Sequence, residues 1–216
     1  VMIGDHHQLT PLVRDTDAAQ HGMSVSLFQR LCKAHPSSVA MLCTQYRMNA
    51  DIMALSNALV YDGRLVCGNE SVACAQFTMK RDACPSWLWD VLDPARPAVF
   101  VDTDAVKAVE SRGASPVGNP VEGGGGVGVC GGVLQTNVAA ADIGILTPYR
   151  QQAKLLRDRC ACEVLTVDQA QGRDWPVVLV SLVRSNKTHT VGELLRDQRR
   201  VNVMITRAKT STSLVL

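Results

Sequence analysis

One run of seven residues limits the fold more than any other part of the sequence: positions 177–183 read V-V-L-V-S-L-V. A strand with so little polar alternation is typical of a parallel sheet that is covered on both faces. Shorter apolar runs at 98–101, 142–146 and 164–167 predict three further strands. Because these strands alternate with helical patterns, the sequence predicts an α/β fold, a parallel sheet with helices on both faces.

The same criteria predict the elements around this sheet. Ser24 or Ser26 could cap a helix that ends before Pro36, and a further helix follows Pro148. Residues 61–97 show no regular period, so we interpret them as an irregular excursion between core elements. The remaining predictions are helices over 49–59 and 199–209 and strands over 1–3, 39–43 and 213–216.

The glycine-rich segment 113–133 gives conflicting signals. The sequence N-P-V-E at 119–122 has the cap, the first-turn Pro and the Glu of a helix start. Four glycines follow at once, and each costs a helix interior about 1 kcal/mol relative to Ala. We therefore expect a helix here to be short, frayed or absent, which would leave one sheet face poorly covered.

Composition excludes several classes of protein. Of the 216 residues, 46% are hydrophobic and 19% are charged, which suits a chain with a buried core and argues against overall disorder. No apolar stretch approaches the roughly 18 residues that a membrane span needs, so we expect no membrane partner. The net charge of +2 is too small to indicate a partner, although it is −3 over 1–141 and +5 over 142–216.

The eight cysteines lack the paired spacing of zinc sites. Cys160 and Cys162 form the only closely spaced pair, and Arg rather than a further ligand flanks them. We expect reduced intracellular thiols and no metal site.

Four polar clusters stand at the ends of predicted elements. In a parallel sheet, ligands bind at the edge formed by the carboxyl ends of the strands, so we expect the clusters to meet there. They are G-D-H-H-Q-L at 4–9, Q-Y-R-M at 45–48, D-Q-A-Q-G-R-D at 168–174 and R-R-V-N-V-M-I-T-R-A at 199–208.

In this order, the clusters resemble the C-terminal motor motifs of superfamily 1 helicases. Longer phrases resemble one family more closely, the DNA replication ATP-dependent helicase/nucleases, over residues 1–216 with gaps at 61–97 and 123–133. These phrases are G-D-H-H-Q-L-T-P-L-V, T-Q-Y-R-M-N, D-I-G-I-L-T-P-Y-R-Q-Q, T-V-D-Q-A-Q-G-R-D, V-R-S-N-K, V-G-E-L-L-R-D and R-R-V-N-V-M-I-T-R-A-K.

The resemblance implies a RecA-like fold and a division into two parts. Residues 1–44 would be the tail of the first motor domain, and residues 45–216 the second motor domain. The sequence holds no G-x-x-x-x-G-K-[ST] loop and no acidic D-E pair. In the family these groups lie upstream, as do the nuclease carboxylates and the iron–sulfur cysteines. The main binding groups for ATP and Mg²⁺, and any iron–sulfur cluster, would then lie outside this chain, which is not expected to hydrolyse ATP alone.

Three catalytic residues follow from the resemblance. Gln8 would sense the γ-phosphate or the attacking water, and Arg47 and Arg207 would reach the γ-phosphate from the second motor domain. Positive charge and hydrogen-bond donors suit that role, because charge spreads over the phosphate oxygens during transfer. Arg200 and Arg207 are seven positions apart, so on one helix they would share a face. The alternatives are a polar loop residue and a solvated pair of arginines.

The resemblance also assigns binding residues. Those expected at the nucleotide are Gln171, Gly172, Arg173, Asp174 and Arg200. Those expected at the nucleic-acid backbone are Thr147, Thr166 and Asn186. Hydroxyl and amide groups bind phosphate without reading sequence, as a helicase requires. A turn or capping role remains the alternative for these last three residues.

Two classes of function remain open. The chain would be the C-terminal motor part of a nuclear ATP-dependent DNA helicase that moves along single-stranded DNA or flaps, together with the upstream motor domain and a nuclease domain. An RNA helicase of the nonsense-mediated-decay type is a related alternative, against which V-R-S-N-K and V-G-E-L-L-R-D count. The other class is a truncated or degenerate motor domain that binds nucleic acid or a protein without catalysis.

Overall fold

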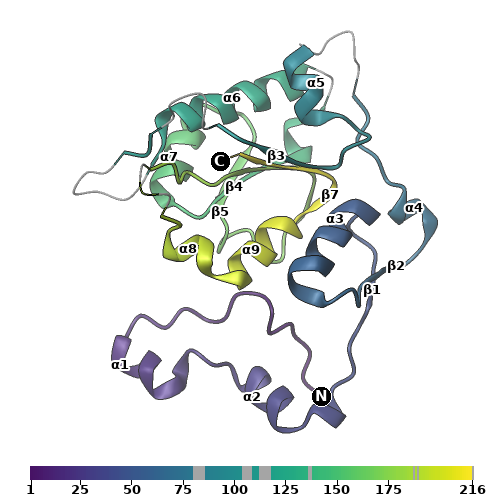
Figure 1. The fold of residues 1–216 in the computed structure, drawn as a ribbon, viewed down its shortest axis with the longest axis vertical. Helices are drawn as coiled ribbons and strands as arrows, with labels where there is room; N and C mark the ends of the chain where they lie inside the picture. The colour runs from purple at the N-terminus through teal and green to yellow at the C-terminus, as the bar shows by residue number, and fades with distance from the viewer. Residues whose placement is uncertain are drawn as a thin grey trace.

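A five-stranded parallel sheet forms the centre of the computed structural model (Figure 1), which describes residues 1–79, 86–103, 109–111, 118–135, 138–186, 188 and 190–215. The strands lie in the order β3-β7-β6-β4-β5, and every neighbouring pair is parallel. Their bounds are Ala98–Val101 (β3), Ile143–Thr147 (β4), Glu163–Thr166 (β5), Trp175–Ser181 (β6) and Ala208–Val215 (β7). This sheet confirms the four strands expected from the apolar runs.

Helices cover both faces of the sheet, as the apolar run had predicted. Successive side chains of a strand point to opposite faces. Val177 and Leu179 therefore pack in one core cluster, with residues of α5 (Ser86–Leu92), α6 (Pro120–Gln135) and α7 (Arg150–Arg157). Val178 and Val180 pack in a second cluster, with residues of α3 (Ala50–Ser56) and α9 (Gln198–Ile205). Figure 1 shows α5, α6 and α7 on one side of the sheet and α3 and α9 on the other.

The expectation of a short, frayed or absent helix in 113–133 is wrong, because α6 runs from Pro120 to Gln135. Its start is fixed by Asn119, whose Oδ1 accepts a hydrogen bond from the backbone N–H of Glu122. Its far end packs closely on α5, since a Cβ at Gly132 would overlap the side chain of Leu88. Burial of Val129, Cys130 and Val133 in the core outweighs the intrinsic cost of the glycines. The face of the sheet is therefore covered.

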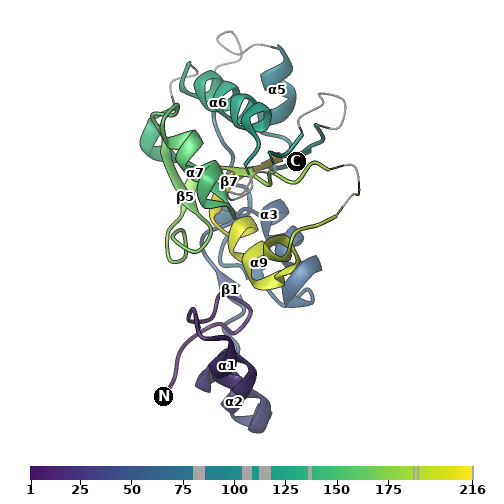
Figure 2. The ribbon, with the colours of Figure 1, turned by 90° about the vertical axis from the view of Figure 1, so that its left-hand side faces the viewer.

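Residues 1–43 contain short helices and no strand. The predicted helix after Ser26 is confirmed as α2 (Leu27–Ala34), with the Ser26 Oγ accepting from the backbone N–H of Gln29. The strands expected over 1–3 and 39–43 are wrong, because neither segment forms a strand. Val1 and Ile3 are exposed, and of residues 39–43 only Cys43 comes close to one, its carbonyl accepting from the backbone N–H of Val66. Figure 2 shows α1 (Thr16–Ala18) and α2 at one end of the molecule, away from the five-stranded sheet.

Residues 44–97 are more regular than expected. β1 (Thr44–Gln45) and β2 (Val66–Cys67) form a two-stranded parallel sheet, and α4 (Glu70–Ala73) follows. Asn49 caps α3, which continues into a wide turn, Asn57–Tyr61. Part of the presumed excursion belongs to the core, since Leu88 and Leu92 of α5 are buried. Residues 80–85 of this region lie outside the described residues.

The helix predicted over 199–209 is shorter than expected. α9 ends at Ile205, where the Thr206 hydroxyl bonds back to the carbonyl of Asn202, and β7 begins at Ala208 instead of 213. Strand pairing decides this boundary, because Ala208 is in register with Trp175 of β6. A short helix, α8 (Glu193–Arg196), precedes α9. None of the described helices is long and apolar enough to cross a membrane.

Candidate functional site

Basic side chains gather at Thr206, between α9 and β7. Arg47 donates from Nη1 to the Thr206 carbonyl at 3.1 Å, and Arg207 donates from Nη2 to the Thr206 Oγ1 at 2.8 Å. Asp174 pairs with Arg47 (Nε to Oδ2, 3.2 Å) and with Lys209 (Nζ to Oδ1, 2.7 Å). The carboxylate of Asp174 is thus shared by two cations, Arg47 and Lys209, and Arg207 adds a third positive charge. This excess of positive charge favours the binding of an anion.

Arg207 is buried, with 1% of its surface exposed. Its Nε donates to the carbonyl of Val203 and its Nη1 to the carbonyl of Arg173. Burial, followed by the charge of Arg47, lowers the pKa of Arg207 to about 10, so the side chain stays protonated at neutral pH. Within the described part of the chain it forms no ion pair, and an added anion would stabilise this charge.

Gln8 reaches this cluster through a chain of hydrogen bonds. Its Nε2 donates to Asp5, and the Tyr61 hydroxyl donates to the same carboxylate oxygen at 2.7 Å. Asn202 of α9 donates to the Tyr61 hydroxyl at 2.8 Å and to the carbonyl of His7. Burial raises the pKa of Tyr61 to about 12, which keeps the hydroxyl neutral. The segment that carries Gln8 is therefore tied to the helix that leads to Arg207.

The expectation that Arg200 and Arg207 share a helix face is wrong. Arg200 lies near the start of α9 and pairs with Asp168 (3.1 Å) and Asp197 (2.9 Å). Arg207 lies beyond the helix end, because the backbone must turn there to enter β7. Seven residues of helix span roughly 10 Å, so the two guanidinium groups serve opposite ends of α9.

The position of the cluster on the sheet also differs from the expectation. Asp174 directly precedes β6, and Arg207 directly precedes β7, so these residues meet at the amino ends of the strands. We had expected the carboxyl edge. The reason is that α9 runs back along the sheet and delivers its C-terminal end to the opposite edge.

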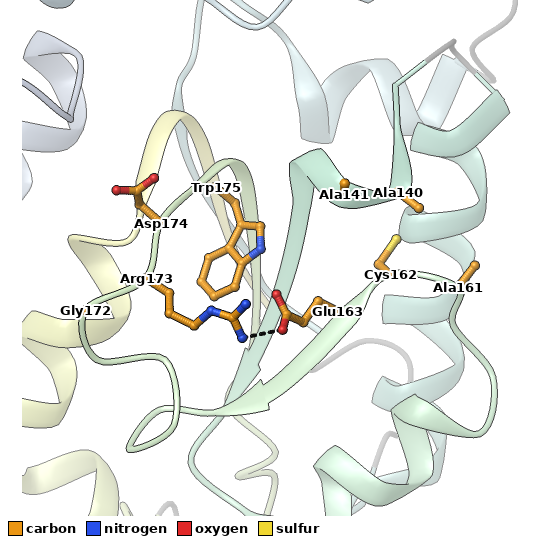
Figure 3. A pocket seen from close by; sticks show the side chains of 9 residues that line it. All are labelled: Ala140, Ala141, Ala161, Cys162, Glu163, Gly172, Arg173, Asp174 and Trp175. Atoms are coloured by element: carbon orange, nitrogen blue, oxygen red, sulfur yellow. Dashed lines mark hydrogen bonds and ion pairs between the residues drawn. The ribbon is translucent and has the colours of Figure 1, made fainter.

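Residues 172–174 border an open depression of about 840 Å³ at the same amino edge. Figure 3 shows Arg173 and Glu163 reaching toward each other across it, beside the ring of Trp175. Gly172 has a φ of +84°, a conformation that favours glycine and turns the chain toward β6. Burial raises the pKa of Asp174, but Lys209 and Arg47 outweigh this, so the pKa lies below 3.8. Gln171 is exposed and is not among the residues that line the depression.

The residues expected at nucleic acid lie at the opposite, carboxyl edge. Thr147 and Thr166 end neighbouring strands and are in register. Both are buried: the Thr147 Oγ1 accepts from the backbone N–H of Tyr149, and the Thr166 Oγ1 donates to Gln169. Asn186 follows β6 and forms a turn, donating to the carbonyl of Thr190 and accepting from its N–H. The structure thus brings Thr147 and Thr166 together, each in a local capping interaction.

The described residues suit phosphate better than a metal ion. No group of three or more His, Cys, Asp or Glu that could hold a metal occurs among them, and Asp174 is already bound by two cations. They therefore do not fit Mg²⁺ or an iron–sulfur cluster. Arg47, Arg207 and Lys209 carry the positive charge and the N–H donors that phosphate oxygens bind.

Two residues of the site were not expected from the sequence. Lys209 pairs with Asp174. The sequence signal for this residue was the phrase T-R-A-K, in which Lys209 stands two positions after Arg207. Tyr46 lies next to Arg47 with 68% of its surface exposed. An exposed aromatic ring can stack on a base. The dipeptide Y-R in Q-Y-R-M carried that signal.

The chain is similar to known proteins over most of its length. A family model described as "AAA domain" matches residues 23–216. The chain belongs to this family. It is 44% identical over 215 residues to DNA replication ATP-dependent helicase/nuclease JHS1 of Arabidopsis thaliana, covering 97% of the chain and 16% of the relative. It is 45% identical over 227 residues to DNA replication ATP-dependent helicase/nuclease DNA2 of Homo sapiens, covering 97% of the chain and 21% of the relative.

These matches confirm the resemblance that the motifs had indicated. The chain spans about a fifth or less of the length of these two relatives. A solved structure, the complex of Arterivirus nonstructural protein 10 (helicase) with DNA, is 17% identical with a TM-score of 0.42, covering 99% of the chain and 32% of that structure. The parallel sheet of the chain and its family match together support the expected RecA-like fold.

Proposed function

We propose that this chain supplies one side of an ATP site in an ATP-dependent DNA helicase of the helicase/nuclease type. Residues 45–216 would form the second motor domain, and residues 1–44 the tail of the first. The observation that carries the proposal is the meeting of Arg47 and Arg207 at Thr206, where positive charge exceeds the charge of Asp174.

In this proposal the cluster acts on the γ-phosphate. Arg47 and Lys209 would each give up part of their contact with Asp174 and bind phosphate oxygens instead. Arg207 would stabilise the negative charge that develops on the γ-phosphate during transfer. Asp174 would then orient Arg47 and stay clear of the phosphates, which its charge repels. The amide of Gln8 would contact the γ-phosphate or the attacking water once its hydrogen bond to Asp5 is released. The exposed ring of Tyr46 is a candidate for stacking on the base.

The remaining candidate residues have separate roles. Gly172 and Arg173 would border the sugar and phosphates from the depression at the amino edge, with Gln171 preceding them in the chain. Arg200 would hold the 168–174 segment through Asp168, since it lies away from Arg207. Mg²⁺ would be held by groups outside this chain, and the isolated chain would not hydrolyse ATP.

Single-stranded DNA or a flap would bind at the carboxyl edge, near Thr147, Thr166 and Asn186. Because α9 runs from that edge to Arg207, it would couple a change at the nucleotide to a change at the DNA. In this picture the upstream motor domain, and a nuclease domain of the same polypeptide, are the partners, and the protein acts in the nucleus. Similarity to the helicase/nucleases over 97% of the chain supports the DNA-helicase class of this proposal.

One observation favours a second candidate, a motor domain that binds without catalysis. Arg207 is 1% exposed and its hydrogen bonds all go to oxygens of the protein. If that arrangement is permanent, the side chain cannot reach a phosphate. The two candidates differ in whether Arg207 matters for turnover.

The test is DNA-stimulated ATP hydrolysis by a longer protein that contains this chain and an upstream motor domain. Arg207→Lys keeps the charge and removes the guanidinium fork, so we expect kcat to fall by about 10²-fold or more with single-stranded DNA binding intact. Arg96→Lys, on an exposed arginine, is the matched control and should leave kcat unchanged. An unchanged kcat in Arg207→Lys would reject the catalytic proposal and favour the second candidate, a motor domain that binds without catalysis.

A further inference from the structure

Two buried sulfur atoms from distant parts of the chain touch each other. The Sγ of Cys130, on α6, lies 2.8 Å from the Sγ of Cys162, which directly precedes β5. Cys130 is 1% exposed and Cys162 is 7% exposed, and both belong to the same core cluster. A covalent S–S bond is ~2.05 Å long, so the two sulfurs would have to approach each other further to form one.

Cys162 can also be reached from solvent. It lines the open depression at the amino edge of the sheet, together with Ala161 and Glu163 (Figure 3). Cys130 lies behind it on the core side of α6, packed with Val129 and Val133. A small oxidant would therefore meet Cys162 first, with Cys130 already in contact.

We propose that Cys130 and Cys162 form a site of reversible oxidation, at which a hydroperoxide such as hydrogen peroxide converts the two thiols to an intramolecular disulfide. In the first step the Cys162 thiolate attacks one peroxide oxygen, the O–O bond breaks, and the other oxygen leaves as water with the thiol proton. In the second step the Cys130 sulfur attacks the sulfur of the Cys162 sulfenic acid. The S–O bond breaks, and a second water carries away the Cys130 proton. The two thiols lose two electrons in total, and the peroxide is reduced to two waters.

The surroundings select Cys162 as the first to react. A hydrogen bond from Cys130 lowers the pKa of Cys162, because it stabilises the thiolate. The same contact raises the pKa of Cys130. Burial raises the pKa of the neighbouring Cys160 to about 11, so that thiol is rarely ionised at neutral pH. Cys130 is therefore the resolving thiol and Cys162 the attacked one.

The disulfide would join α6 to the start of β5, next to the Glu163–Arg173 ion pair at the depression. It would close a loop of about 30 residues, which constrains the unfolded chain and stabilises the folded one. We expect the oxidised protein to melt at a higher temperature than the reduced protein. Addition of dithiothreitol should reverse both the bond and the shift.

The experiment treats the purified chain with hydrogen peroxide, alkylates the remaining thiols and digests the protein without reductant. Mass spectrometry should find the peptides of Cys130 and Cys162 joined and lighter by two hydrogen atoms, with the other cysteines alkylated. Cys130→Ala should lose this species and accumulate a Cys162 sulfenic acid that dimedone traps. Cys74→Ala, at an exposed cysteine, should keep the joined peptides.

Three results would overturn the proposal: both cysteines alkylated after peroxide, Cys162 joined to Cys160 instead, or the bond formed between two chains. The first measurement uses the unmodified protein, so it stands even if Cys130→Ala folds poorly. None of these outcomes depends on ATP hydrolysis, which keeps this test separate from the proposed motor function.

Discussion

Arg47 and Arg207, distant in the sequence, meet at one residue: Arg47 bonds to the carbonyl of Thr206 and Arg207 to its hydroxyl. Two guanidinium groups this close destabilise each other unless negative charge is near. Burial is the main cause that lowers the pKa of Arg207 to about 10, and the charge of Arg47 adds to it. Asp174 supplies part of the missing charge through Arg47 and Lys209, so the cluster is prepared for a further anion.

The first prediction concerns Asp174. Asp174→Asn removes a carboxylate whose pKa is held below 3.8. In the unchanged chain this carboxylate stabilises the fold at neutral pH, and that stabilisation is lost as the pH falls through the lowered pKa. The variant should lack this stabilisation. The unpaired cations should then favour added anions. In thermal melts near neutral pH, inorganic phosphate should raise the melting temperature of Asp174→Asn more than that of the unchanged chain. Asp158→Asn, at an exposed carboxylate, should respond like the unchanged chain. Equal responses in all three proteins would contradict an anion site at this cluster.

The second prediction concerns the buried acid Glu122. The Oε1 of Glu122 accepts from the Ser181 hydroxyl at 2.7 Å and from the backbone N–H of Val183 at 3.1 Å. Burial raises the pKa of Glu122 above its ordinary 4.5, so the folded state binds a proton more tightly than the unfolded state. Stability from this group should therefore fall as pH rises from 4.5 toward the raised pKa.

Glu122→Gln should flatten that fall, because the amide does not titrate. Urea unfolding at a series of pH values measures the slope of the unfolding free energy. Glu193→Gln, at an exposed glutamate, is the matched control and should keep the original slope. The same slope in Glu122→Gln as in the unchanged chain would show that the buried carboxyl has an ordinary pKa.

The third prediction uses two adjacent glycines of α6. A Cβ at Gly131 would meet no atom within 4 Å, whereas a Cβ at Gly132 would overlap Leu88 of α5. Gly131→Ala should therefore stabilise the fold by about 0.5–1 kcal/mol, as Ala does in a helix interior. Gly132→Ala should destabilise it by about 1–3 kcal/mol through overpacking. Denaturant unfolding of the pair measures both, and a gain at Gly132 would mean that α5 and α6 do not pack as closely as described.

Much of the central sheet could be predicted from the sequence, because most of its strands are short runs of apolar residues. The run at 177–183 has apolar side chains on both faces, and the structure places Val178 and Leu179 in opposite core clusters. A cap at Ser24 or Ser26 was predicted for a similar reason, since a side-chain acceptor three residues before a helical N–H is a local signal, and the structure shows Ser26 in that role.

Other features depend on contacts between distant residues. Arg207 leaves its predicted helix because β7 must align Ala208 with Trp175, a pairing that no local pattern reveals. The strand-like run at 1–3 has no strand beside it in the described residues, so its apolar pattern remains unpaired. Helix propensity alone argues against α6, but burial of Val129, Cys130 and Val133 outweighs the cost of its glycines, and the close approach of Leu88 favours a glycine at 132.

For the candidate site, the sequence predicted the residues but not their arrangement in space. The motif phrases named Arg47, Asp174 and Arg207, and the structure brings them together. Their meeting at the amino edge, and the separation of Arg200 from Arg207, depended on the direction in which α9 crosses the sheet. Sequence spacing alone does not fix that direction.

The most direct test of the account is a double-mutant cycle on Arg47 and Arg207 in a longer protein that hydrolyses ATP. If both side chains stabilise the same γ-phosphate, Arg47→Ala should lower kcat by about 10³-fold, and adding Arg207→Lys should lower it little further. Circular dichroism and single-stranded DNA binding would verify that each variant is folded. A kcat for the double variant equal to the product of the two single effects, or no effect of either substitution, would contradict the account.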